Sequence, residues 1–191
     1  MNSFFALLFR QKYITRWGLM RNTTPESLSE HTAEVAAIAH SLAVIGNTVY
    51  GKSYDVGRVT CLALFHDAPE VFTGDMPTPI KYFSPEMRNG YSLIEKQATE
   101  KLISKLPEEL KEEYRSLLSP DEADAELHLL VKIADKLSAY IKCLTEEASG
   151  NREFLNAKSS LEDALNSYNS PELKYFRENF LDAFSLTLDE M

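Results

Sequence analysis

Signals for the start of a helix recur along this sequence, and they restrict its fold more than any other feature. Ser27-Leu28-Ser29-Glu30 is typical of a capping box, in which two side chains satisfy backbone amides that a helix leaves free. We expect a helix from this box to about Ile45. Serine followed by proline, typical of an N-cap and the first helical residue, occurs at Ser84-Pro85, Ser119-Pro120 and Ser170-Pro171. No convincing run of residues alternates as a strand does, so the sequence predicts an all-α fold.

The expected helices carry apolar stripes with helical spacing. On the helix after the capping box, one inward stripe holds His31, Val35, Ile38, Leu42 and Ile45. We expect Asp55 to cap a second helix that ends near His66. The helix after Ser119 places Leu127, Val131, Ala134, Leu137, Ser138, Ile141 and Leu144 inward, and Gly150 is a suitable residue to end it. These stripes predict a helical bundle with a buried core.

Length, charge and cysteine usage limit the class of protein. The chain has 191 residues without a repeat or linker, so we expect one domain over residues 1–191. A net charge of −9 disfavours binding to a nucleic-acid polymer but leaves a small anionic ligand open. Cys61 and Cys143 lie in apolar helical runs, where we expect buried thiols in a reducing compartment. The apolar N-terminal stretch is too short to span a bilayer, so we expect a cytoplasmic protein with no membrane partner.

The adjacent pair His66-Asp67 ends one of the expected helices. Residues 59–65 before it are apolar enough to be buried. Aspartate is almost never fully buried unless it is paired or bound to a metal. Glu70 follows within one turn. Two adjacent groups able to bind a metal at the end of a buried helix indicate a catalytic metal centre.

His31 and Asp135 complete a mixed set of two imidazoles and two carboxylates, each on or beside a buried helical face. Such a set suits one divalent transition metal (Co, Mn, Zn, Fe or Ni) better than calcium, which prefers oxygen ligands. Four protein ligands leave an octahedral ion positions for water and substrate, so it can lower the pKa of a bound water and polarise a phosphoryl oxygen. The expected metal ligands are His31, His66, Asp67 and Asp135.

Each of these residues has a plainer interpretation when taken alone. A single histidine in a helix is more often a core residue than a ligand, and we interpret His40 and His128 in that way. Asp135 by itself is compatible with an ion pair to Lys132 or Lys136. The combination of all the members favours the metal centre.

The order His…His-Asp…Asp resembles the signature of the HD superfamily of metal-dependent phosphohydrolases. Further segments resemble the bacterial HD-domain 5'-deoxynucleotidase family, and the similarity covers nearly the whole chain. These segments are Arg16-Trp17, Ser29-Glu30-His31, His66-Asp67-Ala68-Pro69-Glu70 and Thr73-Gly74-Asp75-Met76-Pro77-Thr78-Pro79. The match is looser between residues 84 and 130. The resemblance implies an HD-type helical bundle that acts as a metal-dependent phosphomonoesterase.

Roles for particular residues follow from the resemblance. The four ligands would hold the metal, with Asp67 and Asp135 also facing the substrate, and Glu70 would orient or deprotonate the attacking water. Its plainer interpretation is a glutamate on the surface. Arg16 fits a phosphate clamp, since a guanidinium matches two phosphate oxygens in one plane. Without the family match it would be an ordinary surface cation.

The remaining implied roles concern the sugar. Trp17 would pack against its 2' face and exclude a ribose hydroxyl, although most single tryptophans are core anchors. Asp75 would contact the 3'-hydroxyl or protonate the 5'-oxygen that leaves. Met76, Pro77 and Thr78 would complete the nucleotide-binding loop, which we expect to be ordered and non-helical because of its prolines. Little in this set reads base edges, so we expect several bases to be tolerated.

The leading hypothesis is therefore hydrolysis of deoxyribonucleoside 5'-monophosphates to deoxyribonucleosides and phosphate. One alternative is HD chemistry on a cyclic nucleotide or a nucleoside triphosphate, but only Arg16, Arg21 and Lys81 supply cations near the motifs. Another is a non-catalytic nucleotide sensor, which predicts a lost ligand or a lost Glu70. The family implies a homodimer, and the stripe of Leu173, Phe176, Phe180 and Phe184 is either its surface or core.

Overall fold

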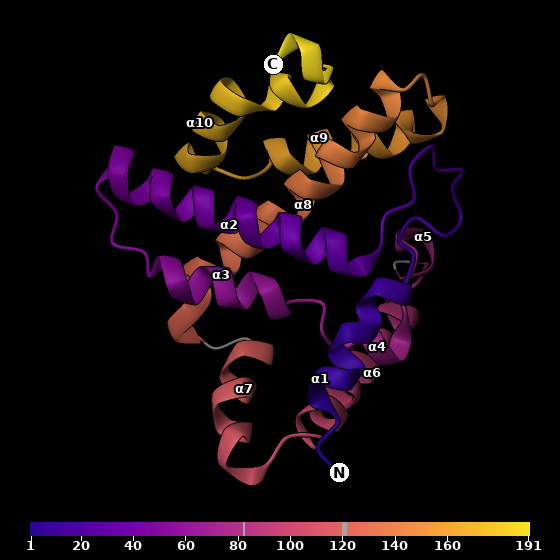
Figure 1. Ribbon diagram of the computed structural model, residues 1–191, viewed down its shortest axis with the longest axis vertical. Coiled ribbons are helices and arrows are strands. Elements are labelled where there is room, and N and C mark those ends of the chain that lie inside the picture. Colours follow the sequence, from indigo (N-terminus) through magenta and orange to yellow (C-terminus); the bar gives the residue numbers. More distant parts are fainter. Residues whose placement is uncertain (82, 120–121) are drawn as a thin grey trace.

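The structure, a computed structural model, describes residues 1–81, 83–119 and 122–191 and is built from helices (Figure 1). In these ranges, an isolated antiparallel bridge between Thr15 and Ser27 is the sole pairing of strand type. The α-helices are α1 (Phe4–Leu8), α2 (Leu28–Tyr50), α3 (Val56–Phe65), α4 (Glu70–Thr73), α5 (Thr78–Lys81), α6 (Pro85–Ile103), α7 (Lys111–Leu118), α8 (Ala125–Ala148), α9 (Leu155–Asn166) and α10 (Pro171–Phe180). The prediction of an all-α fold is confirmed.

Four of the five predicted N-caps form. Ser27 and Glu30 make the capping box of α2, which continues past Ile45 to Tyr50 and ends where Gly51 turns left-handed at φ 65°. Asp55 caps α3 by accepting the amide of Arg58 at 2.8 Å.

Ser84 and Ser170 cap α6 and α10, each with proline at the start of the helix. Ser119 ends α7 instead of starting the long helix as predicted, and Pro120 lies outside the described residues. The long helix α8 begins at Ala125.

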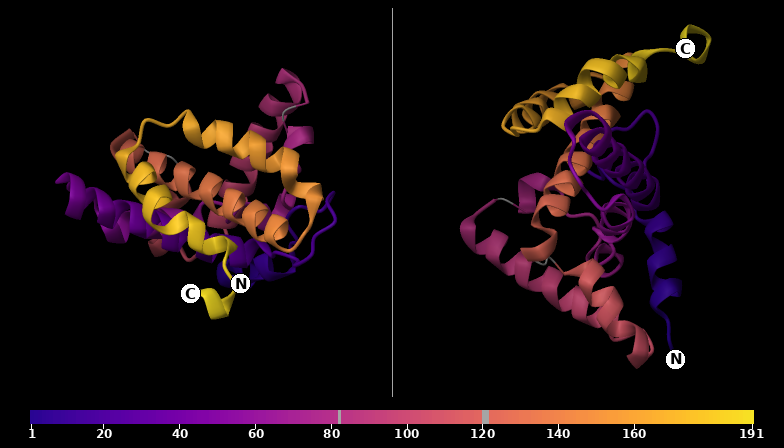
Figure 2. Two further views of the ribbon diagram at one scale, coloured as in Figure 1. Left: turned by 90° about the horizontal axis from the view of Figure 1, so that it is seen from above. Right: turned by 90° about the vertical axis from the view of Figure 1, so that its left-hand side faces the viewer.

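The main core is built around α2, which packs against α3, α8 and α10 (Figures 1 and 2). The predicted stripe on α2 is buried from His31 to Ile45, and most of the predicted stripe on α8 is buried as well. By length and apolar composition α2 is long enough to cross a membrane, but half of that stretch is buried inside the protein, as in a core helix. Burying these stripes against one another supplies the main stabilisation of the bundle.

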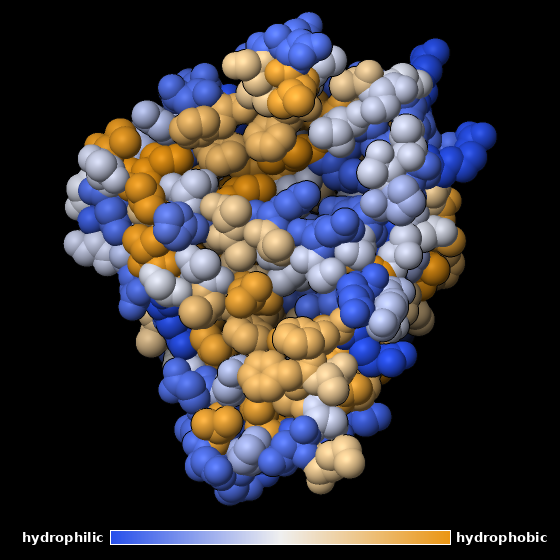
Figure 3. Space-filling model, in the orientation of Figure 1, coloured by the Kyte–Doolittle hydropathy of each residue, from blue (hydrophilic) through white to orange (hydrophobic). Residues whose placement is uncertain are grey.

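A second, smaller core cluster lies under α1, α6 and α7. Its buried members are Phe4, Leu8, Ala68, Leu102 and Leu106. Ala68 belongs to the turn 66–69 that follows α3, so this turn joins the two clusters. On the face in Figure 3, apolar side chains gather where α1 and α7 lie and again near α10, with hydrophilic residues between them.

Some predicted core positions are wrong. His40 and Cys61 are exposed, although each lies beside a buried residue on its helix. A step of one residue turns a helix by about 100°, so a neighbour of a core residue readily faces solvent. Cys143 is buried as predicted. In the C-terminal stripe Leu173 and Phe176 are buried, whereas Phe180 and Phe184 are exposed.

The loop between residues 14 and 27 is tied to α8 by a buried ion pair. Glu146 pairs with Lys142 one turn earlier and accepts backbone amides of Thr23 and Thr24 at 2.9 and 3.2 Å. The Asn151 amide donates to the same carboxylate at 2.7 Å. Burial opposes ionisation of Glu146, but these hydrogen bonds lower its pKa to about 2. The loop therefore has a fixed anchor on α8.

We expect Glu146→Gln to destabilise the protein by about 3–5 kcal/mol at neutral pH, because it leaves the Lys142 charge buried without its partner. The folded pKa of about 2 lies below the ordinary value of 4.5. The contribution of Glu146 is therefore complete above that ordinary value and is lost as the pH falls through about 2. Urea unfolding across the acidic range measures this. Glu147→Gln, which removes an exposed ion pair to Lys158, is the matched control. Equal stability of the Glu146 variant and the wild type at neutral pH would contradict the assignment.

Candidate metal centre

The four predicted ligands come from three elements and meet where the two core clusters join. His31 lies in the first turn of α2, His66 caps the C-terminal end of α3, Asp67 follows in the turn, and Asp135 lies in the middle of α8. Ligand atoms of His31, His66 and Asp67 all lie within 4.8 Å of one another. Asp135 Oδ1 lies 3.2 Å from His31 Nε2. Residues more than a hundred positions apart in the chain thus form one cluster.

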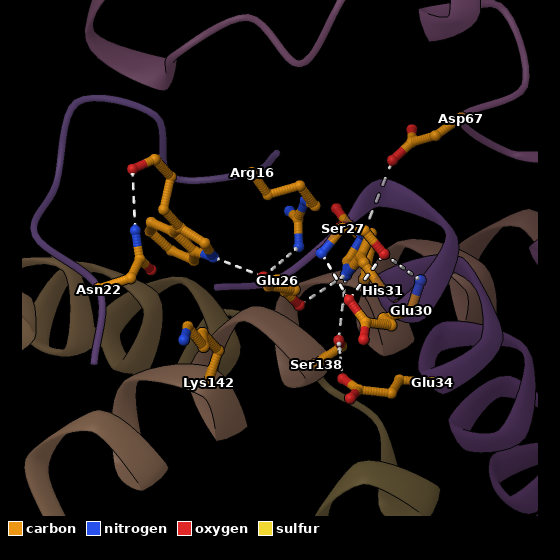
Figure 4. Close-up of polar contacts among 12 residues, drawn as sticks. Arg16, Asn22, Glu26, Ser27, Glu30, His31, Glu34, Asp67, Ser138 and Lys142 are labelled. Atoms are coloured by element: carbon orange, nitrogen blue, oxygen red, sulfur yellow. Dashed lines mark hydrogen bonds and ion pairs between the residues drawn. The ribbon is translucent and has the colours of Figure 1, made fainter. Parts of the chain in front are cut away.

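Hydrogen bonds at Nδ1 fix the orientation of both imidazoles. His66 Nδ1 lies 2.7 Å from the Ala63 carbonyl, which can only accept, so Nδ1 carries the proton. His31 Nδ1 lies 3.1 Å from Ser138 Oγ, and this hydroxyl donates to Glu34 Oε2 at 3.1 Å (Figure 4). Because the hydroxyl hydrogen is used, Oγ accepts from His31 Nδ1. Both rings therefore direct a lone pair on Nε2 into the cluster.

These lone pairs face carboxylate oxygens, which repel them unless a cation lies between. His66 Nε2 is 3.0 Å from Asp67 Oδ2, and His31 Nε2 is 3.7 Å from the same oxygen. Both Nε2 atoms are buried and have no hydrogen-bond partner among the described residues. Buried polar atoms are normally satisfied. A divalent transition metal satisfies all four groups, so the residues fit the predicted ion.

The pKa values of the cluster point to the same need for positive charge. Burial lowers the pKa of His31 to about 4, which keeps this ring neutral. Burial also opposes charge on His66, but the neighbouring Asp67 raises its pKa to about 9. Despite burial, the histidines hold the pKa of Asp67 low, and the His31 contact holds that of Asp135 well below its usual range. A metal bound here would take the place of the proton on His66, because ligating imidazole is neutral.

Glu70 lies beside the cluster, at the start of α4. The helix does not continue from His66, because α3 ends at Phe65 and residues 66–69 form a turn. The Glu70 amide still donates to the Asp67 carbonyl at 3.0 Å, so Glu70 follows Asp67 by one turn as predicted. Burial, then the charges of Asp67 and Asp75, raise the pKa of Glu70 to about 9. A cation in the cluster opposes this rise and favours the carboxylate.

Arg16 and Asp75 lie near enough to Glu70 for their charges to affect its pKa. The Arg16 side chain is 11% exposed, and its Nη1 lies 3.3 Å from Glu26 Oε2. Burial raises the pKa of Asp75, whereas the Arg16 charge and the Trp17 backbone amide lower it. Arg16 also lowers the pKa of Glu70. The three residues predicted to be catalytic therefore influence one another's ionisation.

Trp17 stands beside Arg16 but not in the core. Its Nε1 donates to Glu26 Oε2 at 2.7 Å, and its ring packs edge-on against Phe154 at 5.3 Å between centroids. Sequence reasoning missed Glu26 and Phe154, and no pattern in the sequence singles out either one. It also missed Glu34, which accepts the Ser138 hydroxyl and so orients His31. Its position one helical turn after His31, together with the predicted inward side chain of Ser138, is a signal that could have indicated it.

The predicted nucleotide loop is partly helical. Residues 74–77 are non-helical, with Asp75, Met76 and Pro77 half-buried, but α5 begins at Thr78. The prediction that Thr78 and Pro79 lie in a loop is therefore wrong. Proline is tolerated in the first turn of a helix, where its missing amide has no partner to lose.

A cavity of about 170 Å³ opens beside the centre. His66 and Asp135 form part of its wall, together with Leu62, Leu117, Leu118, His128, Val131 and Lys132. A larger cavity of about 560 Å³ lies among α8, α9 and α10 and includes none of the predicted site residues. Of these two cavities, the smaller one therefore adjoins the predicted metal ligands.

Residues 3–184 match the sequence model of a family described as 5'-deoxynucleotidase YfbR-like. The chain belongs to this family. It is similar to a 5'-deoxynucleotidase of Yersinia pseudotuberculosis, with 49% identity over all of this chain and 97% of the relative. A 5'-deoxynucleotidase of Yersinia pestis shows the same identity and coverage. The predicted family and enzyme class are confirmed.

Solved structures carry the same fold. An HD-domain phosphohydrolase of Listeria innocua superposes with a TM-score of 0.84 and 26% identity, covering 95% of this chain and 88% of that one. A cyanophage S-2L HD phosphohydrolase (DatZ), bound to dA and one catalytic Zn²⁺ ion, superposes with a TM-score of 0.65 and 21% identity. It covers 93% of this chain and 95% of that one. The predicted HD-type fold is confirmed.

We expect Ser138→Ala to weaken binding of Co²⁺ or Zn²⁺ by about 10–100-fold, because His31 loses the acceptor that fixes its Nδ1 proton and its orientation. Isothermal titration of the metal-free protein measures this affinity. Ser41→Ala is the matched control, since the Ser41 hydroxyl donates to the Ile38 carbonyl within α2. An unchanged metal affinity in the Ser138 variant would contradict the assignment.

Proposed function

We propose that this protein is a cytoplasmic metal-dependent phosphomonoesterase, with residues 1–191 acting as one HD-type domain. It hydrolyses deoxyribonucleoside 5'-monophosphates to deoxyribonucleosides and phosphate. One observation carries the proposal: two imidazole lone pairs and two carboxylates converge at a point beside Glu70 and Arg16. Membership of the 5'-deoxynucleotidase family supports the same substrate class.

In this proposal His31, His66, Asp67 and Asp135 hold one divalent transition metal, which is Co, Mn, Zn, Fe or Ni. The catalytic Zn²⁺ of the cyanophage relative supports an ion of this class. When bound, the ion lowers the pKa of water and polarises a phosphoryl oxygen. The protein contributes the fixed geometry of these ligands, which Ser138 and Ala63 hold through Nδ1 of each ring.

Glu70 and Arg16 act on the phosphate in the proposed reaction. Glu70 orients the attacking water and takes its proton while the bond from phosphorus to the 5'-oxygen breaks. Arg16 binds phosphate oxygens through its planar guanidinium. Asp75 either protonates the leaving 5'-oxygen or binds the sugar 3'-hydroxyl, and its raised pKa is compatible with donating a proton.

Other residues contact the sugar and the rest of the nucleotide in this proposal. Trp17 packs against the 2' face of the sugar and excludes ribose, while Met76, Pro77 and Thr78 border the nucleotide. No base-reading group is assigned, so several bases are accepted. The partners are these small nucleotides, without a nucleic-acid polymer or a membrane. A homodimer implied by the family would have the exposed Phe180 and Phe184 available for its surface.

Nucleoside triphosphates and cyclic nucleotides are less favoured as substrates. A triphosphate needs further cations, yet Arg21 pairs with Glu153 and Lys81 pairs with Glu95. A nucleotide sensor without catalysis gives no reason to keep a half-buried Glu70 beside the ligands. These contacts favour the monophosphate and a catalytic role.

Phosphate release from deoxyribonucleoside and ribonucleoside 5'-monophosphates tests the proposed function. We expect turnover of the deoxyribonucleotides, its loss after chelation, and its return with Co²⁺, Mn²⁺ or Zn²⁺. Full activity in protein that contains no metal would overturn the metal mechanism. Equal turnover of deoxyribonucleotides and ribonucleotides would overturn the role given to Trp17.

We expect Glu70→Gln to lower kcat by about 10²–10⁴-fold and to leave metal binding intact, because the amide cannot accept the proton of water. Steady-state kinetics and the metal content of the purified variant measure both effects. Glu86→Gln, at the exposed start of α6, is the control and should keep the wild-type kcat. Near-normal turnover by the Glu70 variant would remove this residue from the mechanism.

A further inference from the structure

Glu26 is a buried carboxylate to which the proposed mechanism gives no role. Only 7% of this residue is exposed, although it lies in the loop before α2. Burying a carboxylate is costly unless charged or polar partners surround it. The partners of Glu26 are therefore informative about its purpose.

Two of the residues assigned to the substrate, Arg16 and Trp17, bind the same oxygen of Glu26. Oε2 accepts Trp17 Nε1–H at 2.7 Å and Arg16 Nη1 at 3.3 Å. The other oxygen, Oε1, lies 3.9 Å from His31 Nδ1. Figure 4 shows Glu26 between Arg16 and His31. One carboxylate thus bonds both the proposed phosphate clamp and the proposed sugar-reading ring, and lies near a predicted metal ligand.

The backbone holds Glu26 opposite these partners. The Arg16 amide donates to the Glu26 carbonyl at 2.9 Å, and the Leu28 amide donates to the Ile14 carbonyl at 2.8 Å. These bonds join the two arms of the loop across the bridge between Thr15 and Ser27. The distance from Glu26 to Arg16 and Trp17 is therefore set by main-chain pairing.

Trp17 has a backbone conformation that needs such support. Among the described residues it is the one non-glycine with positive φ, at 58°. This region is unfavourable for a bulky side chain and persists only where the surroundings fix it. The Met20 amide and the Asn22 side chain donate to its carbonyl. Glu26 supplies the polar contact that fixes the indole itself.

We propose that Glu26 is a positioning residue that sets the selectivity for deoxyribose by holding the indole of Trp17 against the sugar, in register with Arg16. The inference rests on the proposed function and deepens it. Exclusion of a ribose hydroxyl by bulk requires a ring that cannot turn aside, because a mobile ring yields space at little cost. The hydrogen bond from Nε1 to Oε2 removes that freedom, and Phe154 packs edge-on against the ring.

The test compares kcat/KM for 2'-deoxyadenosine and adenosine 5'-monophosphates in the metal-loaded enzyme. We expect Glu26→Ala to lower the preference for the deoxyribonucleotide by at least about tenfold, the effect of losing one hydrogen bond to a charged group. Glu26→Gln should keep most of the preference, because its carbonyl oxygen still accepts from the indole. Glu153→Ala, which breaks an exposed ion pair to Arg21 in the same loop, should keep all of it.

Trp17→Phe provides a second test without a change in the buried carboxylate. This variant retains a bulky ring but lacks the N–H donor, so the preference should fall as in Glu26→Ala. The double variant Glu26→Ala/Trp17→Phe should lose little more of the deoxyribose preference than either single variant, because both substitutions remove the same hydrogen bond. Trp17 is the sole tryptophan of the chain, so its fluorescence anisotropy reports its mobility directly. The anisotropy should fall in Glu26→Ala and stay near the wild-type value in Glu26→Gln.

The outcomes separate this inference from the proposed function. No hydrolysis of either nucleotide by the wild type would overturn the proposed function itself. A wild type that prefers deoxyribose, with an unchanged preference in Glu26→Ala or Trp17→Phe, would overturn the role of Glu26 alone. An equal loss of preference in Glu26→Gln and Glu26→Ala would also overturn it. If Glu26→Ala does not fold, the deoxyribose preferences of Trp17→Phe and Glu26→Gln test the role of Glu26 instead.

Discussion

The repulsion between imidazole lone pairs and carboxylate oxygens is the constraint around which the centre is arranged. Nδ1 of His66 is committed to a carbonyl and Nδ1 of His31 to a serine hydroxyl, so both Nε2 atoms must face Asp67 and Asp135. Only positive charge makes this arrangement favourable. The junction of two core clusters holds the groups in place, because His31 is inside the main core and the turn carrying Asp67 is pinned by Ala68.

Carboxylates that contact the loop between residues 14 and 27 are likewise stabilised by positive charge, which here comes from Arg16 and Lys142. Two buried carboxylates, Glu26 and Glu146, each pair with a cation and accept at least one further N–H group. Glu146 anchors the loop to α8, and Glu26 fixes what the loop presents to the centre. Ion pairs and hydrogen bonds of this kind give little net stability but specify one geometry when every group is satisfied. The proposed contacts of the Arg16 guanidinium and the Trp17 indole with substrate would benefit from that specificity.

Several features were readable from the sequence because they depend on neighbours along the chain. Caps at Ser27, Asp55, Ser84 and Ser170 are local hydrogen bonds, so their residue types predict them well. The inward placement of His31 followed from a stripe that only a helix can bury. Errors arose where one helical step decides the face, as at His40 and Cys61, or where a short helix begins at a proline, as at Thr78 and Pro79. Local propensity does not resolve these cases.

By itself the sequence determined the all-α fold, the family and the pairing of a His-Asp turn with His31 and Asp135, since residue type and spacing carry that information. Only the tertiary structure decided which ring nitrogen of each histidine faces the centre, because Ala63, Ser138 and Glu34 act from other positions or other helices. It also decided that Glu26 lies between Arg16, Trp17 and His31. Those contacts form because the loop folds back over the ten-residue separation between Arg16 and Glu26, and because Phe154, which follows α8 in the chain, packs against Trp17. No local sequence pattern predicts either arrangement.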